Sequence, residues 1–210
     1  MTHRRGRPRN DEARAQVVRI ATELFIRQGY VATTLGEIAQ EAGVAVQTIY
    51  SAHGSKVGLI AAAHDVALAG DGEPVPLVDR AWFRALSRCE SATEAWRAAL
   101  DEMHVRTARV APIYRAMLAA EADPEVMELM RTMRRQRAEF SRLLADQICG
   151  RPGGALVDRG RLATVIYATE SVECYLLFVL ESGWTLTEWR HWVFSSVARE
   201  LEGQGGQKPA

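Results

Sequence analysis

Residues 34–51 read TLGEIAQEAGVAVQTIYS, and this stretch decides how the N-terminal part of the chain folds. Counted from Leu35 as position one, Ala39 stands at position five, Gly43 at position nine and Ile49 at position fifteen. A helix-turn-helix needs a small residue where its helices cross, a residue that tolerates positive φ in the turn, and an apolar residue that locks the second helix onto the first. Because all three requirements are met at these offsets, the stretch predicts a helix-turn-helix.

Local signals support both helices of this motif. Thr34 and Glu37 have the spacing of a capping box, so the first helix should cover residues 34–42. The second helix is expected over residues 45–52. The apolar residues that should form the core between them are Leu35, Ile38, Val44 and Ile49. An ordinary helical hairpin is the alternative, and it is less favoured because it requires neither these offsets nor the basic residues ahead of them.

Helical periodicity extends on both sides of the motif. Apolar residues recur every three or four positions from Val17 to Phe25. Asn10 or Asp11 should cap this helix and Gly29 should end it. A further helix, capped by Ser55 and running to residue 69, is followed by a Gly- and Pro-rich break over residues 70–76.

The second half of the chain also shows helical patterns only. Capping boxes start at Ser91 and Thr185, and Asp123 is an N-cap followed by proline at the first helical position. Pro112 should end the first of these helices. The expected helices cover residues 91–110, 123–149, 158–181 and 185–201. Since no strand pattern appears, the predicted fold class is all-α.

The charge distribution indicates a polyanionic partner. The 210 residues carry no formal net charge, but the first sixty hold eight basic and five acidic residues, a surplus of three. The first nine residues contain four arginines and no acid: Arg4, Arg5, Arg7 and Arg9. A basic arm ahead of a folded domain is typical of proteins that bind nucleic acid.

Other functional classes find no support in the sequence. There is no G-x-S-x-G, no P-loop and no H-E-x-x-H motif, so we do not expect an enzyme or a cofactor. The cysteines, Cys89, Cys149 and Cys174, form no CxxC pair, and no metal site is expected. The most apolar run, Tyr175–Leu180, is too short to cross a bilayer, and no secretory signal is present. These features predict a cytoplasmic protein without membrane partners.

Residues 14–60 resemble the N-terminal domain of the TetR (tetracycline-repressor) family of bacterial regulators. The resemblance lies in Ala21–Phe25, Gly29-Tyr30, Thr33-Thr34, Ile38-Ala39, Ala42–Val44, Thr48–Tyr50 and Gly54–Lys56. It implies a ligand-responsive, homodimeric repressor with a three-helix DNA-binding domain, which a small-molecule effector releases from its operator. Two positions depart from the family: His53 replaces a usual aromatic residue, and Ala45 replaces a frequent serine.

The resemblance also suggests how the chain is divided. We expect a flexible basic arm over 1–9, a helix-turn-helix DNA-binding domain over 10–54, a connecting helix over 55–72, a helical effector-binding and dimerisation domain over 73–203, and a disordered tail over 204–210. Two alternatives stay open. The chain could be an all-α small-molecule-binding protein or enzyme with a vestigial helix-turn-helix, or a regulator controlled by a protein partner.

The second helix of the motif should enter the major groove with its N-terminal half, which contains Ala45, Val46 and Gln47. Glutamine can pair with adenine through two hydrogen bonds, and valine can contact a thymine methyl group. By resemblance, the phosphate contacts are Thr34, Thr48, Tyr50 and Lys56. Arg5 and Arg7 of the arm should reach the adjacent minor groove. The expected partner is double-stranded DNA with a palindromic operator, although caps or solvated faces would explain the same residues.

Effector contacts are expected among large or polar side chains of the second half. The candidates are Trp96, Met103, His104, Tyr114, Met117, Phe140, Tyr167, Glu170 and Glu173. Glu170 and Glu173 interrupt the most apolar helix, where a carboxylate needs a partner or a ligand. Ordinary core packing is the alternative for the aromatic and methionine residues, and the wet edge of the helix is the alternative for the glutamates.

The last two helices are apolar enough to need a partner surface. By resemblance they form a four-helix interface in a homodimer. The candidates for this interface are Tyr175, Phe178, Val179, Trp189, Trp192 and Val193. Burial within one subunit is the alternative.

Overall fold

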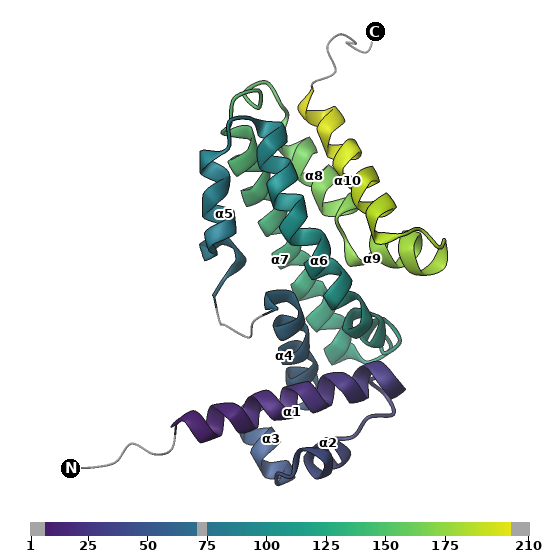
Figure 1. The fold of residues 1–210 in the computed structure, drawn as a ribbon. Helices are drawn as coiled ribbons and strands as arrows, with labels where there is room; N and C mark the ends of the chain where they lie inside the picture. Colours follow the sequence, from purple (N-terminus) through teal and green to yellow (C-terminus); the bar gives the residue numbers. More distant parts are fainter. Residues whose placement is uncertain (1–6, 71–74, 203–210) are drawn as a thin grey trace, which may run out of the picture. The chain divides into compact units, whose positions relative to one another are not determined.

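The structure is a computed structural model that describes residues 7–70 and 75–202, with side chains from Glu12 onward. Within these ranges every regular element is a helix, so the all-α class is confirmed (Figure 1). The longer helices are α1 (Arg7–Gln28), α2 (Leu35–Ala42), α3 (Val46–His53), α4 (Lys56–Ala69), α6 (Ala92–Leu118), α7 (Pro124–Cys149), α8 (Arg159–Thr169) and α10 (Leu186–Leu201). The shorter elements are η1 (Leu77–Asp79), α5 (Ala81–Ala85), η2 (Leu86–Arg88), α9 (Val172–Tyr175) and the π-helix η3 (Leu176–Glu181).

The chain divides into two units. The first comprises the described residues of Met1–Gly72 together with Pro112–Arg131. The second comprises the described residues of Glu73–Ala111 and Thr132–Ala210. Helices α6 and α7 therefore each contribute to both units. The functional domains expected from the sequence, with their limits, remain a prediction.

In the first unit, four helices pack around one apolar core. Leu24 and Phe25 of α1, Ile38 of α2, Ile49 of α3 and Leu59 of α4 are almost completely buried. Apolar burial of this kind stabilises the arrangement by about 25 cal/mol for each Å² removed from water. The predicted helix-turn-helix is confirmed as α2 and α3, with α1 and α4 packed against it.

Helix α1 begins earlier than the sequence suggested. It starts at Arg7, ahead of the expected caps Asn10 and Asp11, so part of the predicted arm is helical. Pro8 does not prevent this, because a proline in the first turn lacks an N–H group that would have no helical partner anyway. The end is as predicted: Gly29 follows the last residue of α1 with φ +86°.

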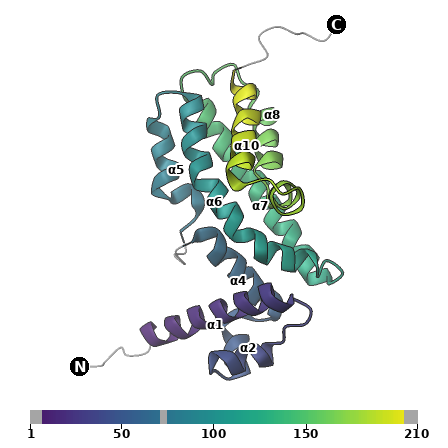
Figure 2. The same cartoon turned by 45° about the vertical axis from the view of Figure 1, so that its right-hand side comes forward.

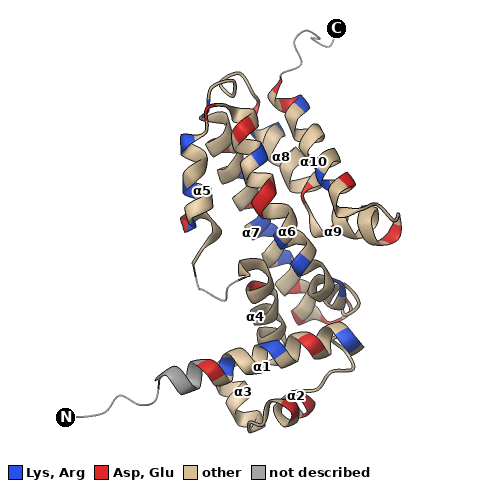
Figure 3. Cartoon of the chain, in the orientation of Figure 1, with Lys and Arg blue, Asp and Glu red and all other residues tan. Residues whose placement is uncertain are grey.

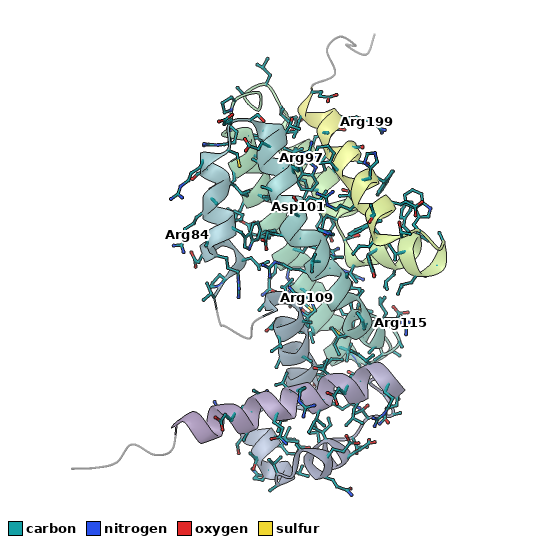
Figure 4. The ribbon with its side chains drawn as sticks, viewed as in Figure 1. Arg84, Arg97, Asp101, Arg109, Arg115 and Arg199 are labelled. Atoms are coloured by element: carbon teal, nitrogen blue, oxygen red, sulfur yellow. The ribbon has the colours of Figure 1, made fainter. Side chains whose placement is uncertain are left out.

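In the second unit, α6, α7, α8 and α10 surround a second core (Figure 2). Trp96 and Leu100 of α6, Leu144 of α7, Leu162 of α8 and Trp189 of α10 are fully buried. Two charged residues of α6 face α10 in this unit (Figure 4): Arg97 lies over the Phe194 ring, 4.5 Å from its centroid, and Asp101 pairs with Arg190.

Two helix boundaries differ from the sequence prediction. Helix α6 continues through Pro112 to Leu118, although proline was expected to end it. The residues on either side are buried, namely Val110, Ala111, Ile113 and Tyr114. An interior proline costs about 3 kcal/mol, whereas burying several large apolar side chains stabilises by about 1.5–3 kcal/mol each. Packing therefore outweighs the local preference.

The predicted helix over 158–181 is broken into α8, α9 and η3. Helix α8 ends at Thr169, because the next residue, Glu170, leaves the helical region with φ −95° and ψ 46°. Ser171 then caps α9, because its Oγ accepts a hydrogen bond from the Cys174 N–H at 2.9 Å. Nothing in this largely apolar run predicted that Ser171 would cap a new helix.

No single helix in the described ranges is long and apolar enough to cross a membrane; one bent pair, Arg159–Thr169 with Val172–Glu181, passes on length and composition only. The three cysteines are free thiols. Among residues 7–70 and 75–202, no group of three or more His, Cys, Asp or Glu side chains is arranged to hold a metal ion.

Candidate nucleic-acid interface

The turn between α2 and α3 has the geometry that its sequence predicts. Thr34 caps α2, and its Oγ1 accepts a hydrogen bond from the Glu37 N–H at 3.1 Å. Gly43 ends α2 with φ +65°, in the left-handed region that glycine adopts without steric cost. The Val44 N–H then donates to the Ala39 carbonyl at 3.0 Å. These bonds determine how α3 leaves α2.

Only half of the predicted capping box is made. The Glu37 carboxylate accepts a hydrogen bond from Gln28 Nε2 at 2.8 Å, rather than from the backbone of Thr34. A second side chain of α1 also reaches α2, because Gln16 Nε2 donates to the Ala42 carbonyl at 3.5 Å. Tertiary contacts thus tie both ends of α2 to α1.

Helix α3 separates a buried side from an exposed side. Ile49 is 1% exposed and anchors the helix on the core, whereas Tyr50 is 48% exposed. The exposed residues at and after the start of the helix are those expected to contact DNA, namely Ala45, Val46, Gln47 and Thr48. Ala45 makes no side-chain cap, as its identity predicts. The N-terminal half of α3 therefore presents an uninterrupted accessible surface.

This surface carries little charge of its own. Figure 3 shows α3 without Lys, Arg, Asp or Glu, and α2 with acidic residues only. Positive charge comes from α1 and from the start of α4. Arg19 pairs with Glu23 at 2.7 Å and Arg27 pairs with Glu41 at 3.4 Å, both at the surface.

Arg14 of α1 is a candidate that the sequence did not single out. It is exposed, and its charge acts on His53 at the end of α3. No ion pair joins Arg14 to another described side chain. The sequence held no signal that Arg14 lies near the candidate DNA-binding surface, because only the packing of α1 against α3 brings it to the end of α3.

Lys56 is more constrained than the other predicted phosphate contacts. Its Nζ lies over the Tyr30 ring, 4.2 Å from the centroid, and 3.4 Å from the Val31 carbonyl oxygen. The side chain is half-buried, and burial lowers the pKa of its ammonium group while Asp123 opposes that shift. Contacts within the protein, with Tyr30 and Val31, therefore hold the Lys56 side chain.

His53, the position that departs from the family pattern, is half-buried. Its Nε2 is buried and has no hydrogen-bond partner among the described residues. Burial and the nearby charge of Arg14 both lower the pKa of the imidazole. Both effects favour the neutral ring, and one polar atom stays unsatisfied at the C-terminal end of α3.

Part of the predicted basic arm lies outside the described residues. This applies to Arg4 and Arg5 and to the expected tail over 204–210. Arg7 and Arg9 belong to the backbone of α1, but their side chains are also outside the described set.

Residues 17–63, which include α2, α3 and part of α4, match the family of bacterial regulatory proteins called tetR. Residues 17–63 form a TetR-type DNA-binding domain. This match and the similarity to a known regulator support a DNA-binding transcriptional regulator rather than an enzyme, in agreement with the sequence prediction.

Similar proteins extend the comparison over most of the chain. It is 24% identical over 184 residues to the HTH-type transcriptional regulator HbdR of Aromatoleum sp. (strain CIB), covering 88% of the chain and 72% of that relative. A putative TetR-family regulator from Syntrophomonas wolfei has a TM-score of 0.70 at 18% identity, with 93% and 97% of the two chains covered. NalD of Pseudomonas aeruginosa, the secondary repressor of the MexAB-OprM multidrug efflux pump, has a TM-score of 0.65 at 15% identity, with 93% and 98% covered. These structures share the fold of both units.

The nine effector contacts predicted from the sequence fall into three groups. Tyr114 and Met117 belong to the first unit. Trp96 and Met103 are core residues of the second unit, and the Trp96 Nε1–H already donates to the Phe194 carbonyl at 3.2 Å. These four have the packing role that was their alternative. The others are partly exposed or polar, namely His104, Phe140, Tyr167, Glu170 and Glu173.

Glu170 lies at the centre of a polar cluster in the second unit. Its Oε1 accepts a hydrogen bond from Thr107 Oγ1 at 2.7 Å, and both side chains are buried. Burial raises the pKa of Glu170 to about 7, although the Thr107 bond and the charge of Arg137 oppose this. A carboxylate buried in this way is a common feature of functional sites.

Glu173 extends this cluster toward α7. Its carboxylate pairs with Arg137 at 2.8 Å and with Arg134 at 3.3 Å. Arg137 also lies over the Tyr167 ring, 4.6 Å from its centroid. The sequence did not select Thr107, Arg134 or Arg137, because their proximity to the glutamates arises only when α6 and α7 pack beside α8.

A separate groove of about 390 Å³ lies between α7 and α8. It is lined by Ala138, Arg142, Asp146, Arg159, Gly160, Ala163, Thr164 and Tyr167. Tyr167 is the only predicted effector contact in this lining. Near the same groove, Arg159 pairs with Asp146 at 3.1 Å.

The predicted dimer contacts separate into buried and accessible residues. Trp189 and Val193 are fully buried in the core of the second unit, so they follow the alternative of burial within one subunit. The remaining four, Tyr175, Phe178, Val179 and Trp192, are half-buried. Phe178 stacks on Trp192 with centroids 4.7 Å apart. The π-helix adds Leu177 and Leu180, about half exposed, which the sequence prediction did not include.

Proposed function

We propose that this TetR-family regulator is a homodimeric repressor that binds a palindromic operator and leaves it when a small-molecule effector binds. The observation that supports operator binding best is the exposed face of α3 from Ala45 to Tyr50, held by buried Ile49 and left-handed Gly43. The name of NalD as a repressor supports the same direction of control. A cytoplasmic location is part of this proposal.

Base recognition is assigned to Val46 and Gln47, which are exposed at the start of α3. Thr34, Thr48, Tyr50 and Lys56 are assigned to phosphates, which position the domain without selecting a sequence. Arg5 and Arg7 are assigned to the neighbouring minor groove. In a twofold dimer the two recognition helices would contact half-sites about 34–36 Å apart.

The effector site is assigned to the polar cluster around Glu170. A fully buried carboxylate linked to Thr107 and near Arg137 supplies hydrogen-bonding groups inside an apolar unit. An effector can shift the regulator between conformers only by as much as its affinities for them differ. Phe140, Tyr167 and Glu173 are neighbouring candidates for this site, and His104 is a further one.

The dimer surface is assigned to the accessible apolar side chains of η3 and α10. Leu177, Leu180, Phe178 and Trp192 provide apolar area that a second copy can cover. A twofold interface places the same patch of both subunits in contact.

A gel-shift titration with a palindromic duplex from the region upstream of its gene tests operator binding. We expect Gln47→Ala to reduce the preference for this duplex over an unrelated one by about tenfold or more, since a bidentate base contact contributes about 1–3 kcal/mol. Gln40→Ala, an exposed glutamine on α2, is the matched control and should keep the preference. Equal loss on both duplexes would remove Gln47 from base recognition. A folded, dimeric wild type that binds no duplex at low salt would contradict the proposed function.

A further inference from the structure

Lys56 is held in place by two groups of the loop after α1. The Tyr30 ring lies 4.2 Å from Nζ, and the Val31 carbonyl oxygen lies 3.4 Å from it. Tyr30 is 5% exposed and packs against Phe25, with ring centroids 5.7 Å apart. The ammonium group therefore rests on a buried, packed ring and on a backbone carbonyl.

An acidic residue from a distant part of the sequence lies in the same neighbourhood. Asp123 precedes α7 and caps it, since its Oδ1 accepts a hydrogen bond from the Glu125 N–H at 2.9 Å. This segment belongs to the first unit, and both views place the turn between α6 and α7 beside the C-terminal end of α1 (Figures 1 and 2).

The charge of Asp123 acts on both Lys56 and Tyr30. It opposes the burial that lowers the pKa of Lys56. Burial first, and then Asp123 and Glu125, raise the pKa of Tyr30 to about 12. Together with the position of this turn beside the end of α1, these effects indicate that the carboxylate favours the charged form of Lys56, although no salt bridge joins the two described side chains.

We propose that Asp123 competes with a DNA phosphate for the Lys56 ammonium, so that the turn between α6 and α7 weakens phosphate binding by the DNA-binding unit. The inference rests on the proposed role of Lys56 in operator binding. Val31 and the Tyr30 ring occupy only part of the donor capacity of the ammonium group, which has three N–H bonds. A phosphate that approaches the remaining side meets a positive charge that Asp123 already offsets in part. Tyr30 is thus a positioning residue for this contact, and Asp123 is the competitor of the phosphate.

This competition gives the rest of the chain a route to DNA affinity. Helix α7 starts directly after Asp123 and continues from the first unit into the second. Any change that moves the start of α7 alters the distance between the Asp123 carboxylate and Lys56. Affinity for phosphates then changes without a change in the base-contacting residues of α3.

Asp123→Asn tests the proposal, because asparagine caps a helix about as well as aspartate does but carries no charge. Fluorescence anisotropy with a fluorescein-labelled duplex should show binding that is tighter by about two- to fivefold at low salt, as expected for one partly screened charge. The gain should appear on the upstream duplex and on an unrelated duplex alike. Glu121→Gln, an exposed acid in the same turn, is the matched control and should change the affinity little.

The same substitution in a Lys56→Met background separates a local competition from a general charge effect. We expect Asp123→Asn to give no gain there, because the ammonium group for which the carboxylate competes is absent. Lys56→Gln serves as a second background, and circular dichroism melting checks that every variant is folded. A gain that persists without Lys56, or an Asp123→Asn variant that binds no better than wild type, would overturn the inference. If wild type binds the duplex in the same titration, a failed Asp123→Asn prediction contradicts only this inference and leaves the proposed function intact.

Discussion

The buried carboxylate of Glu170 makes a quantitative prediction about stability. Its pKa is raised from 4.5 to about 7, mainly because burial disfavours the charged form. Each pKa unit corresponds to about 1.4 kcal/mol, so ionised Glu170 lowers the free energy of unfolding by about 3 kcal/mol. Between these two pKa values the native state binds more protons than the unfolded state, and stability therefore falls as pH rises. The penalty is absent well below pH 4.5 and complete above about pH 7.

Glu170→Gln removes this titration and keeps an oxygen that can accept the Thr107 hydrogen bond. We expect the variant to be more stable than wild type by up to about 3 kcal/mol at pH 8, with the difference shrinking to under about 1 kcal/mol at pH 5. Urea unfolding at both pH values, followed by circular dichroism, gives the two free energies. Glu181→Gln, which removes an exposed carboxylate, is the control and should leave the pH dependence unchanged.

Parallel stability profiles for wild type and Glu170→Gln between pH 5 and pH 8 would refute this reasoning. They would mean that the carboxylate is equally stable as an ion in the native and the unfolded state.

Two further predictions concern the DNA-binding unit. His53→Phe should raise the free energy of unfolding by about 1–2 kcal/mol, because it removes a buried nitrogen without a partner. A lower melting temperature for this variant would show that the imidazole is better accommodated than its contacts indicate. Gly43→Ala should lower stability by about 1–2 kcal/mol, since a β-carbon is strained at φ +65°. Gly36→Ala, at an open site within α2, is its matched control and should be neutral or stabilising by up to about 1 kcal/mol. Thermal melts measure all three variants, and equal effects at both glycines would contradict the role assigned to the turn.

The sequence alone determined the features that depend on residues close together along the chain. The αL position of Gly43, the cap at Thr34 and the burial of Ile49 follow from spacing within one motif, where each backbone or side-chain preference is satisfied by near neighbours. The same holds for the capping box at Thr185 and for the cap at Asp123. Short-range signals of this kind were sufficient to predict the helix-turn-helix and the all-α class.

Only the tertiary structure decided the features that depend on distant segments. Helix α6 continues through Pro112 because packing on both sides outweighs the local cost of proline. Trp189 lies in the core and not at an outer surface, because apolar character does not say which partner covers a side chain. Glu170 meets Thr107 across 63 residues of sequence, and Lys56 rests on Tyr30 with Asp123 nearby. Such contacts form only when separate helices pack, and no local pattern encodes which distant residues will meet.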